Sequence, residues 1–266
     1  MLSVRSDLAH AWRVRREDAA KIQRRLAPLA RLQPLPASGP GSPAIAAGVD
    51  VAYAKAGSAA WAAAVAMNGR FEVVSACVVE GEPDAAYMPG YLAFREGCLS
   101  IQALLGLGVE PDVVFLDSHG VVHERGLGLA SHVGVLLGVP TIGVPKTPFH
   151  SIDHLPGPRR GDHYVLTKEW GAQGASVRLK AGVKPVYVSP GHLVDLPSAL
   201  ALALAWSSGR HRVPEPLSAA HTMSVRARNA AAGIDGGAQG AAESMGRGGR
   251  LGAASGRPPL RVDDAD

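Results

Sequence analysis

The feature that most constrains the fold is a series of three strand-like segments, followed by alternating helical and apolar segments. The strand-like segments span 44–54, 59–67 and 71–80, and each is rich in Ala and Val. Asn68-Gly69 separates the second from the third, and this dipeptide strongly favours a tight hairpin turn. The three segments are therefore predicted to form an antiparallel meander.

The alternation that follows predicts parallel strands. A helical pattern over 91–107 precedes a short apolar run at 111–117, and a second helical pattern over 127–138 precedes another run at 140–144. Strands that are joined through helices pair in parallel, with right-handed crossovers. The predicted class is α/β, with a mixed sheet of three antiparallel strands and then parallel strands, flanked by helices. Further strands are predicted at 162–167, 175–180 and 184–189, and further helices at 195–208 and 216–229.

The two ends of the chain differ from this central part. Residues 7–32 have the apolar spacing of an amphipathic outer helix, and residues 1–31 hold eight basic and three acidic side chains. A Pro- and Gly-rich segment at 33–43 is a predicted linker. From residue 230 onward Gly, Ala, Ser and Arg dominate, which predicts a disordered tail at 230–266. We therefore expect one catalytic domain at 1–229.

Composition excludes some locations and partners. The first residues are charged early, so no apolar run forms a signal peptide, and no stretch approaches the roughly 20 apolar residues of a membrane span. The two cysteines, Cys77 and Cys98, lack a metal-type spacing and are typical of thiols in a reducing compartment. We expect a cytoplasmic monomer without a membrane partner.

Three carboxylates occupy positions within or next to the predicted central elements of the sheet. Asp50 interrupts the first apolar strand, Glu96 lies early in the helix after the meander, and Asp117 closes the fourth strand. A buried carboxylate without a partner is costly, so Asp50 must be paired, protonated or bound to a cation. Taken singly, each residue has a plain alternative. These alternatives are a solvent-facing strand position, a solvated helix side chain and a turn former at a strand end.

Their joint placement favours a metal site. Mg2+ prefers oxygen ligands and retains several waters, so one or two carboxylates and phosphate oxygens suffice to hold it. Ribonuclease-H-like nucleases place their metal-binding acids in this arrangement. The predicted reaction is hydrolysis of a phosphodiester, in which a bound metal lowers the pKa of water and stabilises the leaving oxygen. The sequence has no serine in a nucleophile-elbow motif and no Walker-type glycine loop.

Several strings of residues resemble the endonuclease V family, the deoxyinosine-directed repair nucleases. The likeness runs from roughly Asp18 to Arg228, and the order and spacing of the strings make it specific. The strings are 47–51 (AGVDV), 87–97 (YMPGYLAFREG), 111–117 (PDVVFLD), 130–132 (ASH), 140–144 (PTIGV), 188–192 (VSPGH) and 212–216 (RVPEP).

The resemblance implies a metal centre with supporting residues. Asp50 and Asp117 would ligate Mg2+, with Mn2+ able to substitute, and Glu96 would complete the acidic cluster directly or through water. Lys146 would lie near the scissile phosphate and offset charge in the transition state, and His221 would lie beside the metal. Without the family, a surface lysine at a strand end is an equally simple interpretation of Lys146, and a packing or surface role is the more common one for a lone helical histidine such as His221.

The resemblance also implies contacts with nucleic acid. Tyr87 with Pro89 is similar to the family's wedge, which enters the base stack where the altered base leaves it. Gly90, His123 and Arg125 follow as candidates for the lesion pocket or for strand contacts. Family members cut on the 3′ side of inosine, and the bacterial type acts on DNA. The expected function is a deoxyinosine 3′ endonuclease in DNA repair.

Departures from the family pattern leave alternatives open. Ser118 stands where the family usually has Gly, and Pro145 replaces a usual Ala and removes an N–H donor. One alternative is an endoribonuclease specific for inosine in RNA, since animal members prefer RNA. Another is a lesion-binding protein with little catalysis. A further alternative is a ribonuclease-H-like module with a purely structural role, but it would not explain why an acidic residue, Asp50, lies within an apolar strand.

Overall fold

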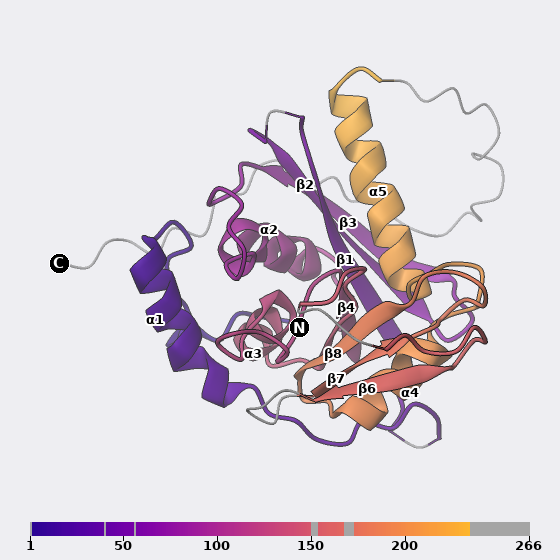
Figure 1. Ribbon diagram of the computed structural model, residues 1–266. Coiled ribbons are helices and arrows are strands. Elements are labelled where there is room, and N and C mark those ends of the chain that lie inside the picture. The colour runs from indigo at the N-terminus through magenta and orange to yellow at the C-terminus, as the bar shows by residue number, and fades with distance from the viewer. Residues whose placement is uncertain (1, 40, 56, 150–153, 168–172, 235–266) are drawn as a thin grey trace.

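The chain folds around one mixed sheet. The computed structural model describes residues 2–39, 41–55, 57–149, 154–167 and 173–234. Within these ranges eight strands follow the order β3-β2-β1-β4-β5-β8-β7-β6. Helices cover both faces of the sheet (Figure 1). This is the ribonuclease-H-like α/β class that the sequence predicts. Most of the tail at 230–266 lies outside the described residues.

The predicted meander is confirmed. The strands β1 (Ile45–Tyr53), β2 (Ala60–Asn68) and β3 (Val73–Gly81) pair antiparallel in sequence order. The turn after β2 is longer than a two-residue Asn-Gly turn. The backbone N–H of Phe71 donates to the carbonyl of Asn68, and Phe71 itself has a φ of 62°. A type I turn followed by a left-handed residue makes a three-residue hairpin loop, and here the Phe71 ring packs edge-on against Trp206, 6.2 Å away.

The predicted parallel pairing is confirmed as well. Helix α2 (Ala93–Leu105) connects β3 to β4 (Val113–Leu116), and helix α3 (Leu129–Leu137) connects β4 to β5 (Thr141–Gly143). Strand β4 runs parallel to both β1 and β5. The carboxyl ends of β1 and β4 therefore point to the same edge of the sheet.

The remaining elements extend the sheet and cover its second face. The strands β6 (His163–Thr167), β7 (Gln173–Val177) and β8 (Val186–His192) add antiparallel to β5 through β8. Helix α4 (Leu196–Ala205) packs on β8 and β7, and helix α5 (Glu215–Ala231) lies along β1 and β2. Helix α5 ends two residues beyond the expected boundary of the domain at 229.

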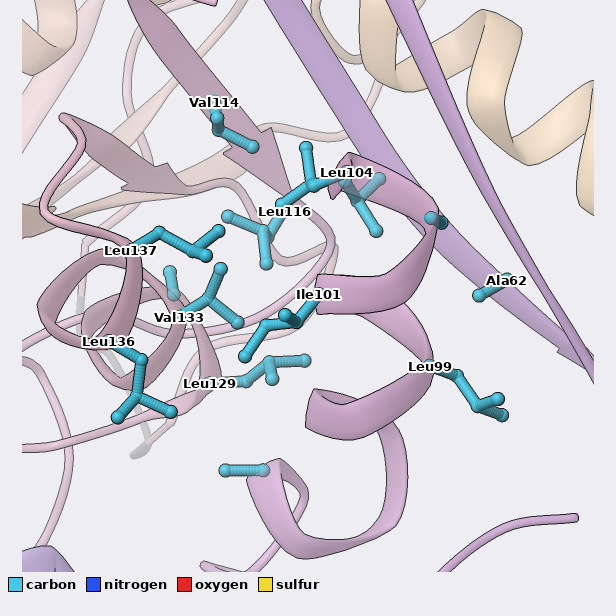
Figure 2. Close-up of a cluster of buried hydrophobic side chains, with 14 of the residues drawn as sticks. Ala62, Leu99, Ile101, Leu104, Val114, Leu116, Leu129, Val133, Leu136 and Leu137 are labelled. Atoms are coloured by element: carbon cyan, nitrogen blue, oxygen red, sulfur yellow. The ribbon is translucent and has the colours of Figure 1, made fainter. Parts of the chain in front are cut away.

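Two hydrophobic clusters lie on opposite faces of the sheet. The first joins α2 and α3 to one face of β1, β2 and β4, and Figure 2 shows Leu104, Leu116 and Leu136 among its side chains. The second joins α4 and α5 to the other face and includes Phe115 and Leu217. Successive strand residues alternate between the two clusters because strand side chains alternate in direction.

The N-terminal segment departs from the predicted helix at 7–32. The structure has a 3-10 turn η1 (Ser6–Leu8), then an extended stretch, helix α1 (Arg16–Leu26) and a second 3-10 turn η2 (Ala27–Leu29). His10 and Trp12 pack against His132 and Phe94, with ring centroids 4.9–6.1 Å apart. Tertiary packing of these rings therefore outweighs the weak local preference for helix.

No helix in the described part of the chain combines the length and the apolar character that crossing a membrane requires.

Candidate active site

The register between β1 and β4 brings two acids together. Val49 pairs with Leu116 in parallel, so the next residues, Asp50 and Asp117, stand abreast at the carboxyl edge of β4. Adjacent strands lie about 4.8 Å apart. Both acids follow residues of the first cluster and therefore point toward the face that carries α5. Two of the three predicted acids are thus neighbours through backbone pairing alone.

Helix α5 supplies partners for Asp50. The Nδ1 atom of His221 lies 3.0 Å from Asp50 Oδ2, and the hydroxyl of Ser224 donates to the same oxygen at 2.8 Å. His221 and Ser224 are three residues apart and share one face of the helix. The helix approaches this closely because Gly48 has no side chain: a Cβ there would lie 2.2 Å from the carbonyl carbon of Pro216. The structure therefore places His221 beside the acidic cluster, as the sequence predicts.

Glu96 reaches the cluster from the opposite layer. It lies in the first turn of α2, and the hydroxyl of Tyr53 donates to its Oε1 at 2.8 Å. Burial, together with the negative charges of Asp50 and Asp117, raises the pKa of Glu96 to about 8, and the hydrogen bond from Tyr53 opposes this rise. Its carboxyl is therefore close enough to both acids to interact with them.

Lys146 pairs with Asp117 directly. Its ammonium group forms an ion pair with Asp117 Oδ2. Burial raises the pKa of Asp117, the charge of Lys146 opposes this shift, and the charge of Asp50 adds to it. The backbone carbonyl of Lys146 accepts a hydrogen bond of 2.9 Å from Arg212 Nη2, which also donates to the carbonyl of Pro185 at 2.6 Å. Arg212 thus fixes the loop that carries the lysine.

The donor set is suited to a hard cation with an open coordination shell. Among the described residues, no group of three or more His, Cys, Asp or Glu side chains is placed to hold a metal ion. The two adjacent aspartates nevertheless offer only oxygen ligands, and the pKa of the nearby Glu96 carboxyl is raised, first by burial and then by repulsion from the two aspartate charges. A divalent cation would relieve that repulsion. Mg2+ is usually bound by one or two carboxylates with waters and phosphate oxygens, so Asp50 and Asp117 have the chemistry that such an ion requires, with Glu96 nearby.

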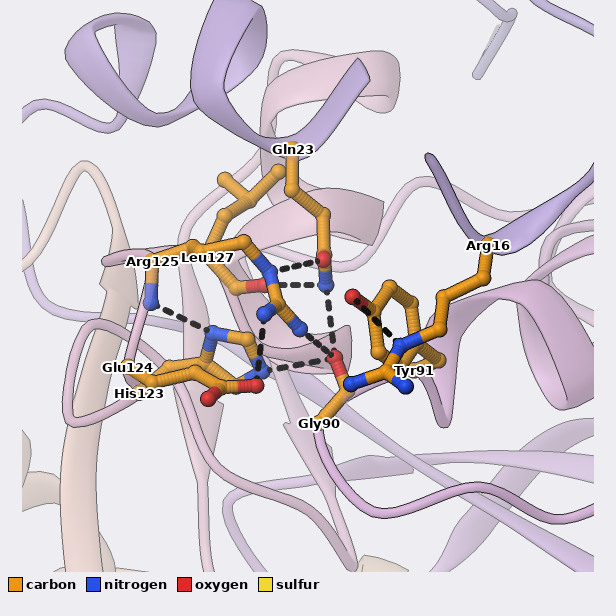
Figure 3. Close-up of polar contacts among 8 residues, drawn as sticks. All are labelled: Arg16, Gln23, Gly90, Tyr91, His123, Glu124, Arg125 and Leu127. Atoms are coloured by element: carbon orange, nitrogen blue, oxygen red, sulfur yellow. Dashed lines mark hydrogen bonds and ion pairs between the residues drawn. The ribbon is translucent and has the colours of Figure 1, made fainter. Parts of the chain in front are cut away.

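The predicted wedge residues lie in an exposed loop before α2. Tyr87 is 68% exposed and Pro89 is also exposed. Gly90, His123 and Arg125 lie together behind this loop and contact one another (Figure 3). Figure 3 also shows Gln23 from α1 bonded into the same group. The tip of the loop is therefore exposed, whereas its inner side is hydrogen-bonded to polar side chains from other parts of the chain.

Neither departure from the family pattern strains the backbone. Among the described residues, Phe71 and Leu193 are the non-glycine residues with positive φ, so Ser118 does not need the freedom of a glycine. Ser118 is buried, and Pro145 is buried with its carbonyl accepting from the N–H of Tyr187. Neither residue therefore places a positive φ next to the acids.

Three contacts of this site do not follow from the sequence reasoning, namely those of Tyr53, Ser224 and Gln23. A weak signal exists for two of them. Tyr53 lies three residues after Asp50 on the same strand, and Ser224 lies one helical turn after His221. Gln23 has no such signal, because the carbonyls that it contacts come from two loops far away in sequence.

Comparison with known proteins agrees with this geometry. A model of the endonuclease V family matches residues 31–222. The curated endonuclease V of Kosmotoga olearia is 36% identical over 82% of this chain and 95% of its own length. The crystal structure of endonuclease V from Streptomyces avermitilis superposes with a TM-score of 0.76 and 38% identity, covering 84% of this chain and 96% of that one.

A further crystal structure carries nucleic acid. It is the endonuclease V of Ciona intestinalis in complex with a DNA that contains an inosine followed by a ribo-adenosine. Its TM-score is 0.70 at 25% identity, and the match covers 81% of this chain and 98% of that one. From the family model, the curated relatives and the shared fold, it follows that this chain belongs to the endonuclease V family and is an endonuclease.

Proposed function

We propose that the chain is a metal-dependent endonuclease that hydrolyses a phosphodiester on the 3′ side of deoxyinosine in DNA, in DNA repair. The observation that supports the proposal is that Asp50 and Asp117 each directly follow the paired residues Val49 and Leu116, and that the charges of both aspartates act on Glu96. The complex of the Ciona relative with inosine-containing DNA supports the choice of substrate.

The proposed chemistry assigns one role to each group. A Mg2+ ion, or Mn2+ in its place, bound by Asp50 and Asp117 and completed by Glu96, would polarise the phosphoryl oxygen and lower the pKa of a bound water. Lys146 presents its ammonium group at the edge of this cluster and would offset charge that develops on the phosphate. His221 is hydrogen-bonded to Asp50 and would orient its carboxylate, and its imidazole would serve as a proton donor or acceptor beside the metal.

We propose that the loop before α2 contacts the lesion. The exposed ring of Tyr87, with Pro89, would fill the space that the displaced base leaves in the stack. Gly90, His123 and Arg125 border the inner side of this loop and would wall the lesion pocket on that side. We also propose that the chain acts as a monomer.

The test is cleavage of an end-labelled duplex that contains one inosine, with the product end mapped by electrophoresis. We expect Mg2+-dependent nicking that EDTA abolishes, and at least a roughly hundredfold lower kcat/KM in Asp50→Ala and in Asp117→Ala. Asp7→Ala, which removes an exposed carboxylate that is paired with Arg5, is the matched control and should cleave normally.

Other outcomes would replace the proposal. Robust cleavage by both aspartate variants would remove the metal site from the reaction. Preferential cleavage of a matched inosine RNA would change the substrate class. Tight binding of inosine DNA with no product under any divalent metal would identify a lesion-binding protein instead.

A further inference from the structure

The carbonyl oxygen of Gly90 accepts hydrogen bonds from three side chains (Figure 3). Arg125 Nη2 lies 2.6 Å from it, His123 Nε2 lies 3.0 Å away and Gln23 Nε2 lies 3.1 Å away. These donors come from helix α1 and from the loop after β4. A single backbone group in the loop before α2 is therefore fixed from two distant parts of the chain.

Gln23 is the residue that joins these parts. Its side chain is 1% exposed, and its Oε1 accepts from Arg125 Nε at 2.6 Å. Its Nε2 donates to the carbonyls of Gly90 and Leu127. All of these bonds require the amide group in one orientation, because its oxygen faces a donor and its nitrogen faces two acceptors. Removing the amide would leave buried polar groups without partners.

The backbone at Gly90 forms a turn that aims the exposed residues. The N–H of Tyr91 donates to the carbonyl of Met88 at 3.0 Å, with Pro89 and Gly90 between them. Gly90 has a φ of 78°, and Pro followed by Gly is the signature of a type II turn. Tyr87 directly precedes this turn. The direction of its side chain therefore depends on the contacts that fix the turn.

The inner side of the turn packs against side chains of the loop after β4. The guanidinium of Arg125 lies 4.2 Å from the centre of the Tyr91 ring. A Cβ on Gly90 would lie 2.1 Å from Glu124 Oε1 and 2.9 Å from Arg125 Nη2, so side chains of the loop after β4 lie close against the turn. Burial lowers the pKa of His123 to about 4, which keeps the ring neutral, and Nδ1 accepts from the N–H of Arg125. The proton of this ring is therefore on Nε2, where it faces Gly90.

We propose that Gln23 is a positioning residue for base displacement, holding the Met88–Tyr91 turn so that Tyr87 enters the base stack at the lesion. This inference rests on the proposed function. Helix α1 thus takes part in recognition of the lesion although none of its residues belongs to the acidic cluster. A residue that only packed α1 against the domain would change stability without changing how far the bases unstack.

The experiment measures unstacking separately from cleavage. An inosine duplex carries the fluorescent base 2-aminopurine next to the inosine, and protein is added to saturation in EDTA. The wild-type protein should raise the fluorescence because the wedge separates the stacked bases. In Gln23→Met the increase at saturation should fall at least roughly threefold, and kcat/KM for the paired duplex should fall on the order of tenfold.

Two controls separate positioning from stability. Gln102→Met makes the same change on α2, where Gln102 bonds to Cys98, and should leave the fluorescence increase unchanged. Gln23→Glu keeps the acceptor for Arg125 but loses the donor to Gly90, so it should lose the increase while α1 stays attached. It also serves as the second variant if Gln23→Met does not fold.

The outcomes separate this inference from the proposed function. A normal fluorescence increase in both folded Gln23 variants would overturn the inference, and so would the absence of any increase in a wild-type protein that cleaves inosine DNA. A wild-type protein that neither cleaves nor binds inosine DNA would overturn the proposed function, and the inference with it.

Discussion

At the scale of single residues, the site combines charged groups at the metal cluster with a neutral histidine behind the wedge loop. His123 is 4% exposed and contacts the carbonyl of Gly90 and the N–H of Arg125. Burial and the charge of Arg125 both disfavour a second proton on its ring. The neutral histidine is therefore a donor through Nε2 and an acceptor through Nδ1 at neutral pH. Its effect on the free energy of unfolding changes only when the pH becomes acidic.

The lowered pKa of His123 predicts a pH dependence of stability. The pKa of histidine falls from 6.5 to about 4 on folding, so the unfolded chain takes up the proton first as the pH drops. The contribution of neutral His123 is present above pH 6.5 and is lost as the pH falls through about 4. The free energy of unfolding should thus decrease on acidification, with about 1–3 kcal/mol of the change due to this residue.

Urea denaturation of the wild type and His123→Gln between pH 7 and pH 4.5 checks this expectation. The difference in the free energy of unfolding between the two proteins should shrink as the pH falls. His192, whose pKa is also lowered to about 4, keeps part of the slope in both proteins. A difference that stays constant over this range would contradict the assignment of the shift to His123.

At the scale of elements, the contact between α5 and β1 determines the surroundings of Asp50. Gly48 lies two residues before Asp50 on the same face of β1, where the backbone of Pro216 and Leu217 comes closest. His221 and Ser224 reach Asp50 from the same helix. Displacing α5 should therefore change both stability and catalysis.

Gly48→Ala tests this dependence. The added Cβ would lie 2.2 Å from backbone atoms, so α5 or β1 must move. We expect a loss of about 1–3 kcal/mol in the free energy of unfolding from overpacking, and a lower kcat on inosine DNA as His221 moves away from Asp50. Gly69→Ala is the matched control, because a Cβ there meets nothing within 4 Å. An unchanged kcat in a folded Gly48→Ala protein would show that the position of α5 does not affect catalysis.

The elements show why the sequence predicts some features and not others. Apolar runs of fixed length predict the strands, and the helices between them predict the parallel pairing that places Asp117 beside Asp50. The helix predicted at 7–32 is wrong over its first half, because apolar residues spaced for a helix can also pack from an extended chain, as Trp12 does. The contacts of Gln23 depend on two loops, whose positions follow only from the assembled fold.

At the scale of the whole molecule, the acids lie where the two hydrophobic layers meet. Asp50 and Asp117 face the layer of α5, whereas Glu96 comes from α2 in the other layer. Both layers pack on the same central strands, so loosening one should loosen the other. The chain should therefore lose its structure and its active site together.

Cavity-forming substitutions in each layer test this cooperativity. Leu104 in the first layer and Leu217 in the second are 0% and 1% exposed, so replacing either with Ala should lower the free energy of unfolding by about 2–5 kcal/mol. Tryptophan fluorescence and far-UV circular dichroism should give one coincident urea transition in both variants. Two separate transitions would show that the layers unfold independently.

The parallel alignment of β1 with β4 restricts where codons can be inserted into or deleted from the gene without loss of activity. One codon gained or lost between Ile45 and Asp50 would shift the strand by a single position and turn Asp50 toward the opposite face, away from Asp117. The connection between β1 and β2 lies after Asp50, so changes in its length leave this alignment untouched. Insertions and deletions in active relatives should therefore fall in such loops and spare the short stretch ahead of Asp50.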